Sequence, residues 1–494
     1  MTAVGLVALL LSAAPAPQTV DTIVVDNRNI FDRSGDGPGF IARLANALHV
    51  RTRASVIRRS LLVAPGQAYD SARVAESERA LRALGVFRLV RVDTTRLGGS
   101  LALRVVTADG WSSKPQANYS TAGGDQTWEI GFVEENFLGT ASELGVSYGK
   151  TPDRRRLDFQ YLNPHFLLPR RMLLVRYGDF SDGKKGAWQT GVPFYQTSAR
   201  HAFITYGEFA RERVLRFRDG VLLDSTEHRV LRGGVTAGVA LHATSRDYVR
   251  LLLGGEIRRE DFAQPTTVPF PFSTFKSGRV AVEIGHVRFR VFEQFNSYAR
   301  REDVDVSQVL RLGALVESGV GYEARGQVST VWRGGYVLLS GEATGLDTTR
   351  IRGRLTIVSQ NLPRQTLIAH VEGGRLGGPQ KPGAEFDPWL DQRGPRLYGA
   401  HAFTGTRTAW LAFEDRILVA EDLWGMVGLG IAPFVDYGGA WYADEAARLG
   451  GNAGIALRFG PTRAVRGDAG ELAVGYRFGA GTGWAIALRR GFRF

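Results

Sequence analysis

From about residue 115 onward, the sequence alternates apolar side chains with small or charged ones at a period of two. In residues 157–161, a leucine, a phenylalanine and a tyrosine alternate with two polar residues, and residues 143–149 and 472–478 repeat the pattern. Successive side chains of a β-strand point to opposite faces, so this period indicates strands with one apolar face. The C-terminal three quarters of the chain is therefore expected to be almost entirely β.

Two architectures fit such alternation. A soluble sandwich turns its apolar face inward, and its two sheets rarely need a segment of this length. A transmembrane barrel turns its apolar face outward to lipid and its polar face to a lumen, and closure satisfies every backbone group. The final stretch favours the barrel because it carries bulky apolar residues on one face and ends on an aromatic: Trp484, Ile486, Leu488, Phe492 and Phe494. We predict a transmembrane antiparallel β-barrel over residues 110–494.

The number of strands follows less directly from the sequence. An allowance of roughly 24 residues for each strand and its connection divides residues 115–494 into 16 strands. Direct counting of alternating stretches gives about 16 to 19, because residues 183–345 are hard to divide. An even number is expected for a single-chain bacterial barrel, and we predict 16.

The N-terminal residues predict export. Residues 4–14 form an apolar run of signal-peptide length, and small residues follow it. The run is too short to span a bilayer as a helix. We predict a signal peptide over residues 1–16, cleaved after Ala14 or Ala16, and localisation in the bacterial outer membrane with the N-terminal domain in the periplasm.

Residues 20–109 have a mixed pattern. Residues 22–25 form a β-branched run, and residues 54–62 and 71–84 carry helical periodicity, the second with Asp70 or Ser71 as N-cap and Gly85 as the closing glycine. The strands expected next are residues 86–93 and 100–107. The predicted order of this domain is β-α-α-β-β.

Composition and motifs exclude several function classes. The chain has no cysteine, so thiolate chemistry is absent. Its net charge of +13 is spread along the sequence without a block of basic residues, which argues against nucleic-acid binding. The charge fits basic residues distributed over a large surface, and the alternative is attraction to anionic lipid headgroups. We find no HExxH, G-x-S-x-G or P-loop motif, and the eight histidines lack metal-ligand spacing. We expect no enzyme activity, no catalytic residues, no metal and no cofactor.

Four parts of the chain, in this order, resemble one family. Residues 56–92 are similar to the helix-turn-helix-strand core of a POTRA domain, and "EENFLG" (134–139) with "NPHF" (163–166) resembles the early barrel strands. "GPRLYGAHAFTG" (394–405) resembles the loop-six motif Arg-Gly-aromatic, and "PFVDYGGAW" (433–441) resembles the Phe-x-Asp-x-Gly motif of strand 13. The family is the POTRA-plus-barrel superfamily of outer-membrane assembly and secretion proteins, the bacterial surface antigen family, which includes BamA, TamA and the two-partner secretion transporters.

In that family the loop-six arginine folds back into the lumen and pairs with acidic residues on the barrel wall. The resemblance assigns this role of latch to Arg396, with Tyr398 at the aromatic position, Gly399 as the displaced glycine, and Glu414 and Asp436 as acceptors. The resemblance also implies that the last two aromatic residues, Phe492 and Phe494, belong to a C-terminal β-signal.

Strand parity supports the two acceptors independently of the family. Apolar residues of 409–419 share the face opposite Glu414, and the residues of 433–438 that face the lumen are Phe434, Asp436 and Gly438. One guanidinium can engage two carboxylates through its forked donors. The alternative is that both carboxylates face a water-filled pore and need no partner.

The chain departs from the family pattern at one position. The family has glycine directly after the arginine, whereas this chain has Leu397, with Gly399 two residues later. If that glycine provides a positive φ, leucine adopts it only at a cost, so we expect a rebuilt loop tip. A second Val-Arg-Gly string, in residues 464–470, leaves room for only two strands, and we interpret it as a short periplasmic turn.

The resemblance implies an assembly or translocation factor of the BamA/TamA type. Unfolded outer-membrane or secreted client proteins would add a strand to the edge of the POTRA domain, and the barrel would insert or export them. Outer-membrane lipid and lipopolysaccharide are the expected surroundings. One alternative is a dedicated two-partner-type secretion transporter. Another is a passive channel, in which the inward-facing Arg458 and Arg477 would favour anions.

Overall fold

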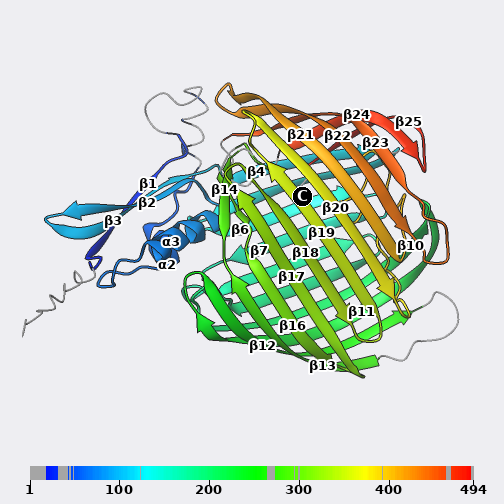
Figure 1. Cartoon of the computed structure of the whole chain (residues 1–494), viewed down its shortest axis with the longest axis horizontal. Coiled ribbons are helices and arrows are strands. Elements are labelled where there is room, and N and C mark those ends of the chain that lie inside the picture. Colours follow the sequence, from blue (N-terminus) through cyan, green and yellow to red (C-terminus); the bar gives the residue numbers. More distant parts are fainter. Residues whose placement is uncertain are drawn as a thin grey trace, which may run out of the picture.

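The computed structural model describes residues 18–31, 40, 43, 46–47, 49–122, 124–263, 273–293, 295–298, 301–391, 393–462 and 469–490. The predicted signal peptide, the Val-Arg-Gly string of 464–470 apart from its last two residues, and the C-terminal aromatics Phe492 and Phe494 lie outside these residues. Figure 1 shows a small N-terminal domain at one end of a large barrel.

The N-terminal domain runs in the order β1 (Thr22–Arg28), α2 (Ala54–Ser60), α3 (Ser71–Ala83), β2 (Phe87–Leu97) and β3 (Ser100–Asp109). Helix α3 begins where the side chain of Asp70 accepts a hydrogen bond from the Ala72 N–H, at 2.8 Å. Ile57 of α2 and Leu81 of α3 pack in one core with Leu103 of the sheet. No helix among the described residues is long and apolar enough to cross a membrane.

The sheet of this domain has the order β1-β3-β2. Strand β3 is central, parallel to β1 and antiparallel to β2. The free edges of the sheet therefore belong to β1 and β2. Of the two strands predicted over residues 86–93 and 100–107, only the first can pair with a further strand, because the second is central. One edge N–H group, that of Val92, is already taken by the side chain of Glu78 at 2.7 Å.

The rest of the described chain forms a closed antiparallel barrel of 20 strands. Its strands in chain order are β4 (Ser113–Ala122), β5 (Asp125–Phe137), β6 (Ser142–Lys150), β7 (Arg155–Asn163), β8 (Met172–Phe180), β9 (Gly183–Val192), β10 (His201–Arg218), β11 (Val221–Ala243), β12 (Asp247–Ala263), β13 (Ser273–His286), β16 (Gln308–Val316), β17 (Val320–Trp332), β18 (Gly335–Gly345), β19 (Thr349–Ser359), β20 (Gln365–Gly377), β21 (Arg407–Leu423), β22 (Val427–Trp441), β23 (Gly450–Pro461), β24 (Gly470–Gly479) and β25 (Gly483–Arg490).

The prediction of 16 strands is wrong, and the allowance per strand explains the error. Several connections are much shorter than that allowance assumed, such as the two-residue links between β8 and β9, β10 and β11, and β17 and β18. Five strands, β21 to β25, follow the loop that carries Arg396, the number that follows loop six in a barrel of 16 strands. The additional strands therefore precede this loop, which is the eighth connection at its end of the barrel and not the sixth.

The two faces of the barrel differ as the alternation predicted. In β22, Val435 and Tyr437 are exposed on the outside, whereas Phe434 and Asp436 are buried in the lumen. Leu411 and Phe413 of β21 and Ile455 of β23 extend the exposed apolar outer face. An outward apolar face on a closed barrel is the arrangement required by a lipid bilayer.

The barrel is uneven in height. Strands β10 and β11 contain 18 and 23 residues, whereas β25 contains 8. A strand of 23 residues is about 75 Å long, and a bilayer needs about 9–11 residues per strand. The β10–β11 hairpin therefore extends beyond the membrane at the end opposite the N-terminal domain (Figure 1).

The closure between the first and last strands is sparsely paired in the part of the chain that the structure describes, which ends at Arg490. Among the described residues, β25 and β4 share one register pair, Leu488 with Thr121. By contrast, β24 and β25 pair continuously from Gly470 to Arg477. Over the residues that the structure describes, β4–β25 is therefore the least extensively paired junction of the barrel, and we call it the seam.

The connection between β13 and β16, at the end of the barrel beside the N-terminal domain, contains an additional element. Between β13 and β16 the chain forms a separate two-stranded sheet, β14 (Phe289–Glu293) and β15 (Arg301–Asp305). Figure 1 places β14 at the end of the barrel that meets the N-terminal domain.

Candidate functional site: a buried arginine latch

Arg396 lies in the loop of residues 378–406, which connects β20 to β21 and enters the lumen from the end opposite the N-terminal domain. The side chain of Arg396 is 0 % exposed. Of the described residues, it has one of the largest fully buried side chains. A fully buried guanidinium is stable only with partners for its charge and its donors, and the surrounding strands provide them.

Three carboxylates surround the guanidinium. Asp436 of β22 accepts from Nε at 2.8 Å and from Nη2 at 3.0 Å, which is the bidentate geometry that arginine favours. Nη1 donates to Glu414 of β21 at 2.7 Å and to Glu471 of β24 at 2.9 Å. One side chain thus joins three strands of the wall to the loop. The backbone N–H of Arg396 also donates to Asp436, at 3.2 Å.

The face of the guanidinium is occupied as well. The Phe434 ring lies under it, with the guanidinium carbon 4.0 Å from the ring centroid, so the motif phenylalanine forms a cation–π contact. Burial by itself lowers the pKa of Arg396, but the charges of Asp436, Glu471 and Glu414 outweigh it and raise the pKa well above its usual value. Arg396 is therefore a permanent cation in the lumen.

The motif glycine of β22 has a steric role. A Cβ on Gly438 would overlap the carbonyl oxygen of Ala409 and the Cα of Trp410 on β21. Gly438 pairs directly with Trp410 in the register of these two strands. Glycine at this position lets β21 and β22 come close together beside the carboxylates that bind Arg396.

Leu397, the departure from the family pattern, is accommodated without a left-handed backbone. Leu397 is absent from the residues with positive φ, and Gly394, two residues before the arginine, has a φ of +81°. The Leu397 side chain is fully buried against small residues of the wall: Ala432, Ala456, Ala473 and Ala487. The loop therefore has a left-handed residue at Gly394, and it buries the apolar side chain of Leu397 against the wall.

Tyr398 and Gly399 fasten the loop on both sides of the seam. The hydroxyl of Tyr398 donates to the carbonyl of Phe478, at the end of β24, at 2.8 Å. Asp125, the first residue of β5, accepts from the Ala400 N–H at 2.7 Å. A Cβ on Gly399 would lie 2.6 Å from the carboxylate of Asp125, so glycine permits this approach. The loop thereby connects the β24–β25 side of the barrel to the β4–β5 side.

Sequence reasoning did not include two residues of the site. Glu471 is the third acceptor of Arg396, and Asn452 of β23 accepts from the Leu397 N–H at 3.2 Å while its amide approaches Asp436. Both follow from parity, because Leu472 and Ile455 lie on the outward faces of their strands and place Glu471 and Asn452 inward. The family motif names the arginine and the strand-13 aspartate, and neither of these two.

Further arginines complete the charge cluster. Arg416 of β21 donates to Glu414 at 2.5 Å, and Arg489 of β25 lies 3.9 Å from Glu471. Arg458, expected from the sequence to face a pore, is buried in the same region, and Arg477 approaches the ring of Tyr398. Arg416 and Arg458 are buried, whereas a water-filled channel would leave them exposed; Arg477 is only partly buried.

The mouth of the barrel is covered where the loop meets the long hairpin. His401 lies between two carboxylates, with Asp387 Oδ2 at 2.5 Å and Asp153 Oδ1 at 2.9 Å. Its ring stacks on Phe217, near the tip of the β10–β11 hairpin, with ring centroids 3.7 Å apart. Burial lowers the pKa of His401, but its hydrogen bonds to Asp153 and Asp387 raise it to about 9. The protonated histidine thus holds three segments together.

The described residues contain no group of three or more histidine, cysteine or carboxylate side chains arranged to hold a metal ion. The site consists of a loop held inside a barrel by charge pairs. Together with the exposed apolar outer face, it defines a transmembrane β-barrel of the outer-membrane type with an internal arginine latch.

No family model matches the chain. Among solved structures, BamA from Haemophilus ducreyi lacking POTRA domains 1–3 is similar at 10% identity and a TM-score of 0.41, over 95% of this chain and 84% of that one. CdiB from Acinetobacter baumannii is similar at 12% identity and a TM-score of 0.43, over 95% and 73%. CdiB from Escherichia coli is similar at 10% identity and a TM-score of 0.47, over 96% and 76%.

The first prediction concerns Arg396 itself. Replacement by alanine leaves three buried carboxylates without their shared cation, so we expect Arg396→Ala to lower the free energy of unfolding by about 3–5 kcal/mol. Arg396→Lys should lose less, because an ammonium keeps the charge but not the forked geometry. The measurement is the urea midpoint, followed by heat-modifiable migration in electrophoresis. Arg211→Ala, which removes an exposed pair with Glu227, is the matched control. Equal midpoints for Arg396→Ala and the control would contradict the latch.

The second prediction concerns the close approach at Gly399. In Gly399→Ala the new methyl group displaces the Asp125 carboxylate, and the Ala400 N–H loses its acceptor. We expect a loss of about 1–3 kcal/mol in the free energy of unfolding. Gly353→Ala on β19, where a Cβ would meet no atom within 4 Å, should show no such loss. A similar effect of both substitutions would show that the approach at Gly399 has no special importance.

The third prediction concerns pH. Because the pKa of His401 is raised when folded, its stabilisation is complete below about pH 6.5 and is lost as pH rises to about 9. We expect the wild type to lose at most about 3 kcal/mol over this window. His401→Asn keeps a residue that tolerates the positive φ at this position and should lack this decline. His286→Asn, which removes an exposed pair with Asp247, should keep it. A decline that persists in His401→Asn would assign it to another group.

Proposed function

We propose that the protein is an outer-membrane assembly or translocation factor of the BamA/TamA type, which receives unfolded client proteins and inserts or exports them through its barrel. The observation that carries the proposal is the seam. Within the described range, which ends at Arg490, strands β4 and β25 share one register pair, and the Arg396 loop bridges the two sides from within through Asp125 and the Phe478 carbonyl. A wall that is weak at one place and held there by a removable loop is suited to opening toward lipid.

The N-terminal domain supports the same proposal. We infer that it is a POTRA-like domain on the periplasmic side, with outer-membrane lipid and lipopolysaccharide around the barrel. Its sheet has free edges at β1 and β2, and an extended client segment could add to one of them by backbone hydrogen bonds. Such a function requires no chemical step and no cofactor.

Two other functions are distinguished by experiment. A dedicated secretion transporter would act on one exported partner, and loss of the protein would then leave other outer-membrane proteins unaffected. A passive channel would conduct ions in planar bilayers with and without residues 20–107. The charge cluster around Arg396 and the covered mouth at His401 favour a closed barrel over a standing pore.

The fourth prediction tests the seam. The chain has no cysteine, so Thr121→Cys with Leu488→Cys introduces a single pair at directly opposed positions. Opposed residues of neighbouring strands have Cβ atoms about 4.5–5.5 Å apart, close enough to form a disulfide after small adjustment. We expect oxidation to reduce the folded levels of other outer-membrane proteins to those of a strain lacking the gene, and reduction to restore them.

The control is the pair Val282→Cys with Leu312→Cys, which crosslinks β13 to β16 on the outer face far from the seam in the strand order. This disulfide should leave activity unchanged. Full activity of the oxidised seam pair would exclude opening at β4–β25. If loss of the gene changes no other outer-membrane protein, the assembly function itself is abandoned.

A further inference from the structure

The β14–β15 hairpin is not needed to connect its neighbouring strands. His286, the last residue of β13, pairs directly with Gln308, the first residue of β16. Trp332 and Gly335 pair in the same way, and two residues suffice to connect β17 to β18. The connection between His286 and Gln308 instead consists of residues 287–307. A long excursion between adjacent strand ends indicates that the hairpin has a role of its own.

The hairpin packs inside the barrel wall. Its residues Phe292, Phe295 and Val306 form a buried apolar cluster with inward-facing residues of β18, β19 and β20: Tyr336, Val358 and Ile368. Outward-facing neighbours on the same strands, such as Val371, are exposed instead. The hairpin therefore occupies the lumen at the end of the barrel beside the N-terminal domain.

The adjoining wall, at β22, is shaped to receive the hairpin tip. A Cβ on Gly428 of β22 would overlap the ring of Tyr298, and a Cβ on Gly430 would lie 2.7 Å from its hydroxyl. Asn296 also accepts a backbone hydrogen bond from Ala469 at 3.1 Å. Glycines that create space for one aromatic ring indicate a defined seat for the hairpin and not a chance contact.

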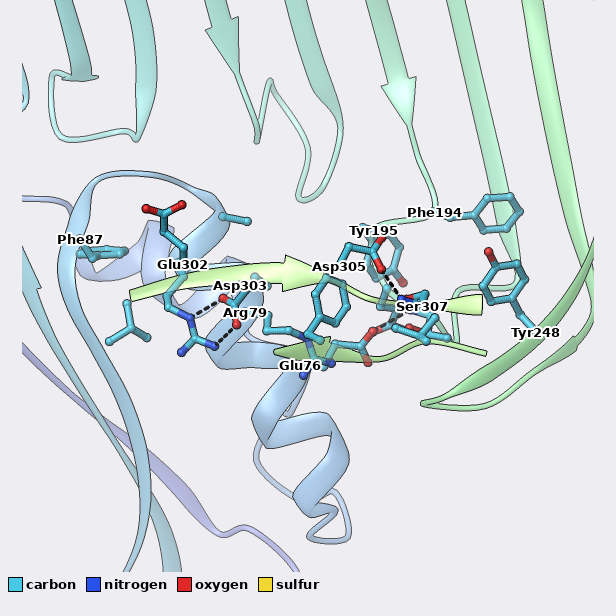
Figure 2. Close-up of a pocket in the computed structure, with 18 of the residues that line it drawn as sticks. Glu76, Arg79, Phe87, Phe194, Tyr195, Tyr248, Glu302, Asp303, Asp305 and Ser307 are labelled. Atoms are coloured by element: carbon cyan, nitrogen blue, oxygen red, sulfur yellow. Dashed lines mark hydrogen bonds and ion pairs between the residues drawn. The ribbon is translucent and has the colours of Figure 1, made fainter. Parts of the chain in front are cut away.

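A second anchor ties the hairpin to the N-terminal domain. Arg82 of α3 donates to both oxygens of Asp303 on β15, at 2.6 and 3.0 Å, and Arg79 lies over the ring of Phe289, 4.9 Å from its centroid. Beside this anchor is a cavity of about 650 Å³ (Figure 2). Its walls come from α3, β2, the β9–β10 connection and the hairpin. The domain thus holds the hairpin at points, with open space between them.

The hairpin also contacts the latch. Arg416 donates through Nη1 to the carbonyl of Phe295 at 2.8 Å and to the side chain of Asn296 at 3.2 Å. Its Nε donates to Glu414, which in turn binds Arg396. One arginine therefore connects the hairpin tip to the charge cluster of the loop that enters from the other end.

We propose that the β14–β15 hairpin is a built-in plug that closes the lumen at the end beside the N-terminal domain, and that the Arg82–Asp303 pair lets movement of that domain withdraw it. The inference goes beyond the proposed function, because closure of the lumen by the hairpin does not depend on a client protein. When the domain shifts, the bidentate pair transmits the movement to β15, and the seat of Tyr298 and the cluster around Ile368 are emptied together.

The fifth prediction tests the plug through a single cysteine. Ile368 is fully buried beneath the hairpin, so Ile368→Cys in the cysteine-free chain should react slowly with a bulky hydrophilic maleimide in nanodiscs. Replacement of residues 287–307 by a two-residue turn should expose this cysteine and speed labelling by at least about tenfold. Leu97→Cys, on the exposed tip of the N-terminal domain, gives the rate of an open site. Heat-modifiable migration verifies that each variant is folded.

The anchor is tested by charge reversal. Asp303→Arg places two arginines together, and labelling of Ile368→Cys should accelerate by about tenfold. The exchange Arg82→Asp with Asp303→Arg should restore slow labelling. Asp93→Arg, which reverses a charge of the same domain in an exposed pair with Arg91, should have no effect. If Asp303→Arg does not fold, Arg82→Gln breaks the same pair from α3.

Each outcome decides the proposal. Unchanged labelling after removal of the hairpin would show that it does not close the lumen. Unchanged labelling in a folded anchor variant would show that the domain does not control it. Labelling of Ile368→Cys at the rate of Leu97→Cys in the parent chain would show that no closure exists. None of these measurements uses a client protein, so their failure is distinct from failure of the seam experiment.

Discussion

The interaction on which the rest of the structure depends is the burial of one guanidinium among three carboxylates. Removing these charges from water is costly, and their mutual attraction repays the cost only in one geometry. Arg396 therefore contributes less to overall stability than to position. It fixes the loop against β21, β22 and β24, and the loop in turn fastens the poorly paired edges of β4 and β25. The loop that carries the arginine thus also bridges the two sides of the seam.

Contacts continue from this cluster toward both ends of the barrel. At one end, His401 joins the loop to the β10–β11 hairpin through Phe217. At the other, Arg416 joins it to the β14–β15 hairpin, and Arg82 joins that hairpin to α3. The N-terminal domain, the lumen and the outer mouth are thus connected by a short series of charged and aromatic contacts. A displacement at one end has a physical route to the seam, because each contact is shared by two elements.

Much of this arrangement could be predicted from the sequence, and the failures have identifiable causes. Period two predicts strands with one apolar face, and the final stretch favours a barrel over a sandwich. Parity places Glu414 and Asp436 in the lumen, because side-chain direction is a local property. The predicted number of strands was wrong because the length of each turn depends on which strands pair. Parity also places Glu471 in the lumen, but no motif marks it as a partner of the arginine. The plug hairpin could not be predicted, since its contacts join residues such as Arg82 and Asp303 that lie far apart in the sequence.

The alanines beneath Leu397 have a consequence for variation among related chains. Ala432, Ala456, Ala473 and Ala487 carry no reactive group, yet their small size provides the space that Leu397 fills. Interiors are close-packed, so added volume on the wall must be removed from the loop. A relative with glycine after the arginine would leave this space empty unless its wall carried larger side chains. Among related chains, a smaller side chain after the arginine is therefore expected to accompany larger side chains on the facing wall. The total side-chain volume at this contact should stay nearly constant.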